Sequence, residues 1–240
     1  MQNGRVAVVP RGIRVYAIGD IHGRADLLEQ TLTRIDWDSA DHPGFRDIEV
    51  FIGDYVDRGP SSSEVITQLL QRSDFRETVF LRGNHEQLLV AFLQDPAVLE
   101  HWQQIGGRET LVSYGLQPGL RPNRQEQIEL CASLNRMLPR RHRDFFNKLR
   151  DSYVCGDYFF VHAGVRPGVP LSRQNDDDLL WIRNEFLEYE GGDFEKVVVH
   201  GHTPVMEPEI LPQRINIDTG AYATGNLTCV ALEGDTVRVV

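Results

Sequence analysis

Three apolar segments of this chain each run into a glycine that is followed by a short oxygen-bearing side chain. They end at Gly19-Asp20, Gly53-Asp54 and Gly83-Asn84. After each one, apolar residues recur with helical spacing, so the first part of the chain alternates strand and helix. Alternating units of this kind form a parallel sheet that helices cover. We call Gly19-Asp20, Gly53-Asp54 and Gly83-Asn84 the polar corners. Because ligands bind beyond the carboxyl ends of such strands, we expect these three corners to lie together at one edge of the sheet.

The expected helices carry start signals. Apolar residues after Gly23 fall on one helical face. Ser61 and Glu64 have the spacing of a capping box, in which the two side chains satisfy free N–H groups of the first turn. Asn84 and Gln87 repeat that spacing after the third strand. The sequence therefore predicts helices that begin just beyond the polar corners.

The rest of the chain predicts a helical insert and a second set of strands. Residues from roughly 96 to 150 are mostly helical in pattern and carry no cluster of metal-binding side chains. We expect a hairpin over 153–162, a helix over 176–187, and strands over 197–199, 214–218, 227–232 and 236–240. A second sheet packed on the first would give a two-sheet sandwich flanked by helices. No linker separates the parts, so we expect one domain over residues 1–240.

Composition limits the possible partners and the location. The formal net charge of −10 argues against a nucleic-acid partner, which needs a basic surface. Acidic groups that bind divalent cations are nevertheless compatible with phosphate chemistry. No apolar run is long enough to span a bilayer and no signal peptide is visible, so we expect a cytoplasmic protein without a membrane partner. The three cysteines are too far apart to suggest a disulfide framework or a thiolate zinc site.

Histidines accompany the polar corners. His22 and His85 stand beside two of them, and later strands end at His162 and at His200-Gly201-His202. Asp, Asn and His gathered at one edge would offer hard oxygen and imidazole donors to a divalent cation. The remaining histidines, at positions 42, 101 and 142, have no partner pattern and are expected at the surface.

Each corner also has an ordinary structural explanation. Asp20 could cap the following helix, and Asn84 is a common N-cap residue. Asp57 and Arg58 could form a surface ion pair in a turn. Two carboxylates and an arginine at the end of a strand are costly to bury unless they are paired or bound to metal, so residues 54–58 favour a functional interpretation.

The order and spacing of the motifs resemble the metallophosphoesterase superfamily and, more specifically, the phosphoprotein phosphatase family in its compact bacterial and phage form. The matching segments are 19–23, 53–60, 83–86, 162–164, 180–183, 201–204 and 216–220. They run from about Arg14 to about Ala221, and only the insert at 96–150 contains no matched motif. The resemblance implies an α/β fold with a two-sheet β-sandwich flanked by helices, the calcineurin-like metallophosphoesterase fold.

The resemblance also implies a site for two divalent metal ions. The implied ligands are Asp20 and His22 for the first ion, Asn84, His162 and His202 for the second, and Asp54 as the bridge between them. Hard oxygen and imidazole donors favour manganese, with iron or zinc as alternatives. His200 is interpreted as a packed or hydrogen-bonding histidine.

Four further residues receive roles from the resemblance. His85 would be the general acid that protonates the leaving oxygen, and Asp57 would hold its imidazole. Arg58 and Arg183 would bind the non-bridging phosphoryl oxygens through their planar forks of donors. For Arg183 the alternative is an exposed residue of a charged helix.

The expected function is that of a serine/threonine protein phosphatase, with phosphotyrosine as a further option. A hydroxide held by both metals would attack a phosphoprotein or phosphopeptide directly, and regulatory subunits are unknown. The alternative is a symmetrical diadenosine tetraphosphate hydrolase or another small phosphoester hydrolase. Those hydrolases typically replace the aspartate of the Asp-Arg-Gly motif, so Asp57 favours the phosphatase. An inactive metal-binding scaffold and a nuclease fit less well.

Overall fold

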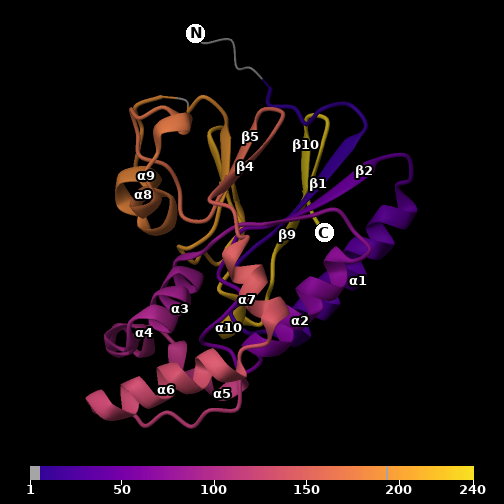
Figure 1. The fold of residues 1–240 in the computed structure, drawn as a ribbon. Helices are drawn as coiled ribbons and strands as arrows, with labels where there is room; N and C mark the ends of the chain where they lie inside the picture. The colour runs from indigo at the N-terminus through magenta and orange to yellow at the C-terminus, as the bar shows by residue number, and fades with distance from the viewer. Residues whose placement is uncertain (1–5, 193) are drawn as a thin grey trace.

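Two five-stranded sheets pack face to face in this computed structural model, which describes residues 6–192 and 194–240 (Figure 1). The first sheet has the order β10-β9-β1-β2-β3. Its strands are β1 (Ile13–Ile18), β2 (Arg46–Phe51), β3 (Thr78–Phe80), β9 (Cys229–Glu233) and β10 (Thr236–Val239). β1, β2 and β3 are parallel as predicted, while β9 runs antiparallel to both β1 and β10. The sheet is therefore mixed, with its parallel part carrying the three polar corners.

The second sheet has the order β4-β5-β6-β8-β7. Its strands are β4 (Ser152–Cys155), β5 (Tyr158–Val161), β6 (Val197–His200), β7 (Glu209–Ile210) and β8 (Arg214–Asn216). β4 and β5 form the predicted antiparallel hairpin, and β5, β6 and β8 are parallel. The short strand β7 was not predicted, because two residues are too few to show a pattern.

Strand residues alternate between two buried surfaces. On β1, Val15 and Ala17 pack toward the second sheet against residues such as Phe160, while Tyr16 and Ile18 pack in the cluster that includes α1 and α2. This alternation is the two-residue period of a strand, with both faces covered. The predicted two-sheet sandwich flanked by helices is confirmed.

Helices cover both outer faces of the sandwich. The first sheet is covered by α1 (Ala25–Asp41) and α2 (Ser62–Ser73), and the second by α8 (Asp176–Trp181) and α9 (Asn184–Leu187). The continuous helix predicted over 176–187 is wrong, because the chain leaves helical geometry at Ile182 and Arg183. This break falls at one of the predicted phosphate-binding residues.

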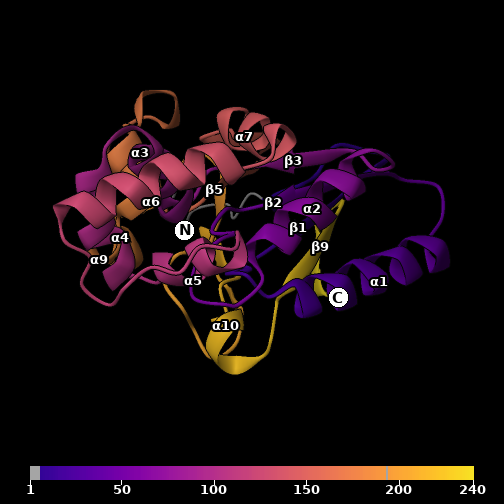
Figure 2. The ribbon, with the colours of Figure 1, turned by 60° about the horizontal axis from the view of Figure 1, so that its bottom comes forward.

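Residues 96–150 are largely helical. The segments are η1 (Pro96–Val98), α4 (Leu99–Gln104), α5 (Gly107–Ser113), α6 (Arg124–Met137) and α7 (Arg140–Asn147). Both views place α4 and α6 at the end of the molecule opposite α1 (Figures 1 and 2). His142 of α7 is 6% exposed, so its predicted surface position is wrong. No helix of residues 6–192 or 194–240 is long and apolar enough to cross a membrane.

The helix starts differ in detail from the predicted ones. Ser61 is the N-cap of α2, but its side chain makes no capping hydrogen bond. The N-cap of α3 (Asn84–Gln94) is Gly83, one residue before the predicted cap Asn84. The carboxylate of Glu86 accepts the N–H of Gly83 at 2.9 Å and thereby closes this helix start. The side chain of Asn84 is therefore not needed as the helix cap and is available to bind a ligand.

Candidate active site

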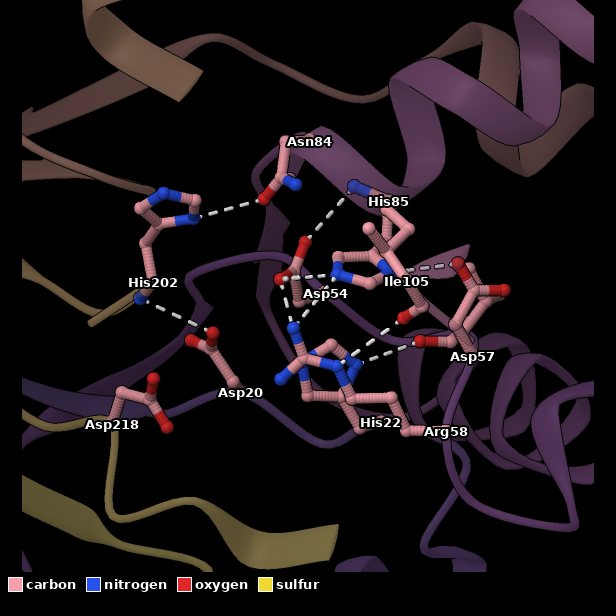
Figure 3. Close-up of polar contacts among 12 residues, drawn as sticks. Asp20, His22, Asp54, Asp57, Arg58, Asn84, His85, Ile105, His202 and Asp218 are labelled. Atoms are coloured by element: carbon pink, nitrogen blue, oxygen red, sulfur yellow. Dashed lines mark hydrogen bonds and ion pairs between the residues drawn. The ribbon is translucent and has the colours of Figure 1, made fainter. Parts of the chain in front are cut away.

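The six predicted metal-binding side chains lie together beyond the carboxyl ends of five strands, and Figure 3 labels five of them. Asp20 and His22 follow β1, Asp54 follows β2, Asn84 follows β3, His162 follows β5 and His202 follows β6. All six side chains are buried. The structure thus brings together every residue that the sequence analysis predicted as a metal ligand.

One group of donors lies around Oδ2 of Asp54. Nδ1 of His22 lies 2.9 Å from the carbonyl oxygen of Val56, an acceptor, so this nitrogen carries the proton. The other ring nitrogen, Nε2, consequently turns a lone pair toward Oδ2 of Asp54 at 3.5 Å. Nε2 of His85 lies 3.7 Å from the same oxygen. Nε2 of His22 and Oδ2 of Asp54 are thus two acceptors that face each other, an arrangement that a cation between them would stabilise.

A second group lies around Oδ1 of Asp54. Nδ1 of His162 lies 3.0 Å from the carbonyl oxygen of Ile52, so its Nε2 carries the lone pair. That Nε2 is 3.4 Å from Oδ1 of Asp54, 2.9 Å from Oδ1 of Asn84 and 3.2 Å from Nδ1 of His202. Asp54 therefore belongs to both groups of potential ligands.

Burial supports metal binding by these histidines. It is the dominant cause that lowers the pKa of His22 and of His162, and it lowers the pKa of His202 to about 2. The three rings are consequently neutral, which is the form that binds metal.

Three carboxylates share the same buried space. Burial raises the pKa of Asp20 well above its usual value, and the charges of Asp218 and Asp54 raise it further. Oδ2 of Asp20 accepts the N–H of His202 at 3.1 Å, but its buried Oδ1 has no hydrogen-bond partner among the described residues. Divalent cations would compensate this negative charge and occupy the free oxygen, so the donor set fits the predicted metals.

Backbone strain is concentrated at the site. The non-glycine residues with positive φ in the described part of the chain are His22, Asp54, Asp57, Arg58 and His202. Such conformations cost of order 1–3 kcal/mol each and persist only where the surroundings enforce them. All five belong to the predicted site.

Glu86 is a supporting residue of the Asp54 loop. Its buried carboxylate accepts the backbone N–H groups of Asp54 at 2.9 Å, Tyr55 at 2.8 Å and Val56 at 3.3 Å. Gly83 packs so tightly beside this loop that a Cβ there would overlap Oδ1 of Asp54. From its place in the Gly-Asn-His-Glu motif, Glu86 is expected to have a supporting structural role rather than to bind metal.

The predicted general acid has the expected partner. Nδ1 of His85 lies 2.6 Å from Oδ2 of Asp57. Burial alone would lower the pKa of His85, but the carboxylates of Asp54 and Asp57 outweigh it and raise the pKa. Arg58 is half-buried, with Nη2 3.3 Å from Nε2 of His85 and its guanidinium carbon 4.7 Å from the ring centre of Tyr222. Sequence analysis missed Tyr222.

Arg183 lies at the exposed rim of the site. After burial, its positive charge is one of the further causes that lower the pKa of His162 and of His202. It contacts neither ring directly in the described structure, unlike Arg58, which touches His85. Arg183 itself has non-helical backbone angles, φ −132° and ψ −102°, at the break between α8 and α9.

A family model described as calcineurin-like phosphoesterase matches residues 13–235. The chain belongs to this family. Members use divalent metals, in agreement with the donor groups around Asp54. The sandwich described above is accordingly the calcineurin-like metallophosphoesterase fold.

Curated relatives within this calcineurin-like phosphoesterase family cover most of the chain. A protein from Bacillus cereus (strain B4264) is 30% identical over 224 residues, which cover 88% of this chain and 87% of the relative. A protein from Anoxybacillus flavithermus is 29% identical over 250 residues, with 92% of each chain covered. Both carry the name bis(5'-nucleosyl)-tetraphosphatase PrpE [asymmetrical].

Solved structures of other phosphatases and phosphoesterases share the fold. A candidate diadenosine tetraphosphatase superposes with a TM-score of 0.61 at 21% identity and 98% coverage of both chains. The cold-active protein tyrosine phosphatase of a Shewanella species gives a TM-score of 0.59 at 16% identity, covering 95% of this chain and 80% of the other. At these identities the likeness concerns the fold alone.

The expected serine/threonine protein phosphatase activity, with a phosphoprotein or phosphopeptide substrate, is wrong. The curated relatives are named for a dinucleotide substrate and not for a phosphoprotein. The error lies in the use of Asp57 as a discriminating residue. Asp57 orients His85, and a proton donor serves an ester and an anhydride alike, so this residue does not identify the substrate.

Proposed function

We propose that this metallophosphoesterase hydrolyses bis(5'-nucleosyl) tetraphosphates with two divalent cations. The observation that carries the proposal is Asp54, whose two carboxylate oxygens face His22 on one side and His162 on the other. The names of the relatives supply the substrate class. The protein is further proposed to be a single catalytic domain over residues 1–240, with the helical segments between 96 and 150 as an insert.

The proposed cation ligands are those of the sequence analysis: Asp20, His22, Asp54, Asn84, His162 and His202. Manganese is the proposed metal, with iron and zinc as alternatives, because carboxylate, amide and imidazole donors suit these ions. When bound, the pair of cations would neutralise phosphate charge and activate the hydrolytic water.

The remaining residues would bind the polyphosphate of the substrate and transfer a proton to the leaving group. Arg58 lies beside His85, and its donors would bind the non-bridging oxygens of the attacked phosphate. Arg183, at the rim of the site, would bind another phosphate group of the same substrate. His85 would give its Nε2 proton to the leaving oxygen, while Asp57 holds the Nδ1–H. A water oxygen becomes bonded to phosphorus, the bridging P–O bond breaks, and the proton of the water replaces the one that His85 gave.

The position of the cut is part of the proposal. An asymmetrical cut of a dinucleoside tetraphosphate yields a nucleoside triphosphate and a monophosphate, whereas a symmetrical cut yields two diphosphates. The sequence analysis gives the symmetrical cut as the alternative function. The relatives' names include the word asymmetrical, and we adopt that cut here.

The test uses metal-stripped enzyme to which Mn²⁺, Fe²⁺ or Zn²⁺ is returned separately. Diadenosine tetraphosphate and a set of phosphoserine and phosphothreonine peptides are compared by kcat/KM, and the nucleotides are separated by ion exchange. ATP together with AMP is the expected product pair. Two molecules of ADP would correct the position of the cut, and a preference for peptides would refute the substrate class.

A further inference from the structure

Two side chains of the helical insert contact the carboxylate of Asp57. Oδ1 of Asp57 accepts the hydroxyl of Thr110 from α5 at 2.5 Å. Oδ2 accepts the indole N–H of Trp102 from α4 at 2.7 Å, and His85 occupies the same oxygen at 2.6 Å. Asp57, Trp102 and Thr110 are each 0% exposed. Two of these three contacts to the Asp57 carboxylate therefore come from the insert.

The insert also hydrogen-bonds to the backbone of Asp57 and Arg58. Asp57 and Arg58 have φ values of 73° and 67°, which are unfavourable for residues with a side chain. The N–H of Asp57 donates to Oγ1 of Thr110 at 2.8 Å. The N–H of Arg58 donates to the carbonyl of Gly106 at 3.1 Å, and its Nε lies 3.4 Å from the carbonyl of Ile105. The link between α4 and α5 thus enforces a strained conformation.

Gly106 permits this close approach. Its φ is +112°, and a Cβ at this position would lie 2.7 Å from Cγ and 2.8 Å from the backbone nitrogen of Arg58. Any larger residue would have to push Arg58 away or change the path of the link.

Trp102 is anchored on the element that carries the general acid. Its ring lies 5.2 Å from that of Phe92 on α3, the helix whose first turn contains His85. The indole therefore spans from the α3 side of the site to the Asp57 side. A donor fixed by buried packing at one end and directed at a carboxylate at the other is well suited to orienting that carboxylate.

We propose that Trp102, Thr110 and Gly106 are positioning residues of the phosphate-cleaving site. Trp102 and Thr110 fix the Asp57 carboxylate so that its remaining acceptor position faces Nδ1 of His85, and Gly106 sets the position of Arg58. The inference rests on the proposed function, since it takes His85 as the proton donor and Arg58 as a phosphate ligand. The insert, which matched no family motif, is then a working part of the site.

The first test removes one hydroxyl. Thr110→Val keeps the side-chain volume but loses both contacts to Asp57, whereas Thr110→Ser retains the hydroxyl. We expect Thr110→Val to lower kcat by roughly 10-fold to 100-fold, the scale of a misplaced catalytic group, with Thr110→Ser close to wild type. Tyr114→Phe is the matched control, because Tyr114 lies at the end of the same helix and its hydroxyl contacts His142, at 2.9 Å, and Ser63 rather than Asp57.

The second readout separates proton delivery from general damage. Phenyl phosphate has a poorer leaving group than 4-nitrophenyl phosphate and depends more on an acid. Thr110→Val and Trp102→Phe should therefore slow the phenyl ester more than the nitrophenyl ester, whereas the control should leave the ratio unchanged. Equal losses on both esters would refute the inference. Trp102→Phe decides the matter if Thr110→Val does not fold, as judged by thermal unfolding.

A double-mutant cycle tests the connection to His85. Combined with His85→Asn, Trp102→Phe and Thr110→Val should add little further loss, because both act through the same imidazole. The cycle is measured with whichever substrate the wild-type enzyme cleaves fastest. Losses that multiply in the double variants would show that Trp102 and Thr110 act independently of His85, and would refute the assignment.

Gly106→Ala tests the Arg58 side. It should weaken inhibition by inorganic phosphate several-fold and raise KM, while the ratio of the two aryl esters stays near the wild-type value. Unchanged phosphate affinity would remove Gly106 from the proposal. The aryl esters contain no nucleoside, so failure of the enzyme on diadenosine tetraphosphate refutes the proposed function without deciding this inference.

Discussion

Nδ1 of His85 lies 2.6 Å from Oδ2 of Asp57, and the two side chains are 1% and 0% exposed. A carboxylate in this position fixes the proton on Nδ1 and directs Nε2 the other way. Nε2 accordingly faces Asp54 and Arg58, at 3.7 Å and 3.3 Å, where a phosphate would be held. In the proposed mechanism this pair would deliver a proton into the metal-binding space, whatever the leaving group.

Replacing His85 with Asn should lower turnover of a phosphoester by roughly two to four decades, the usual contribution of a general acid. Metal content should remain near that of the wild type, because the ring is held by Asp57 and is not among the proposed ligands. Metal analysis of the purified variant beside its kcat provides the check. Loss of the cations in this variant would instead make His85 a ligand of the group around Oδ2 of Asp54.

The strand ends were predictable because their pattern is local. Apolar runs followed by Gly-Asp or Gly-Asn place Asp20, Asp54 and Asn84 at the ends of parallel strands, and parallel strands end at one edge. His162 and His202 follow from the same rule in the second sheet. The order of the motifs then predicted the metallophosphoesterase superfamily, which the family match confirms.

Contacts made across the fold were not predictable in this way. Trp102 and Thr110 lie 45 and 53 residues after Asp57 and meet it only because α4 and α5 fold back over α2 and α3. Positive φ at Asp54 and Asp57 is likewise imposed by surrounding contacts, and the presence of an aspartate does not by itself predict it. The substrate prediction was wrong for a different reason. The predicted residues are proposed to bind metal and phosphate and to transfer a proton, and these roles are common to nucleotide and phosphoprotein substrates.

Asp54→Asn should remove metal and activity together. The amide keeps the size of the carboxylate but loses its charge, and one of its two faces becomes an N–H₂ donor that cannot bind a cation. Because Asp54 belongs to both ligand groups, we expect both cations to be lost. Asp144→Asn on the exposed side of α7 is the control. A variant that is metal-loaded and active would overturn the bridging role.

Glu86→Gln should destabilise the loop that carries Asp54. The carboxylate accepts four backbone N–H groups, from Asp54, Tyr55, Val56 and Gly83, and an amide cannot accept all of them. The amide keeps one of the two oxygens, so two N–H groups lose their acceptor; each buried donor without a partner costs about 1–3 kcal/mol, and the free energy of unfolding should fall by at least that amount. Urea denaturation of the metal-free protein measures it. Glu188→Gln at an exposed position should change little, and equal stability of both variants would contradict the assigned role.

The stability of the protein should fall as the pH drops from about 7 toward 5, in part because of the buried His142, which is not among the proposed metal ligands. Burial, followed by the charge of Arg141, lowers the pKa of His142 below its usual 6.5. The unfolded chain therefore binds a proton at a higher pH than the folded protein does. The contribution of His142 is fully present above its unfolded pKa and is lost as the pH falls toward the folded pKa.

His142→Gln isolates this contribution from that of the other buried histidines. Nδ1 of His142 lies 2.9 Å from the hydroxyl of Tyr114, which can donate to the neutral ring but not to the protonated one. A glutamine can accept that hydroxyl without titrating, so the variant should lose less stability than the wild type between pH 7 and pH 5. The slope of the unfolding free energy against pH, from urea melts of both metal-free proteins, is the quantity to compare. Parallel slopes would mean that His142 can take up a proton in the folded protein as readily as in the unfolded chain.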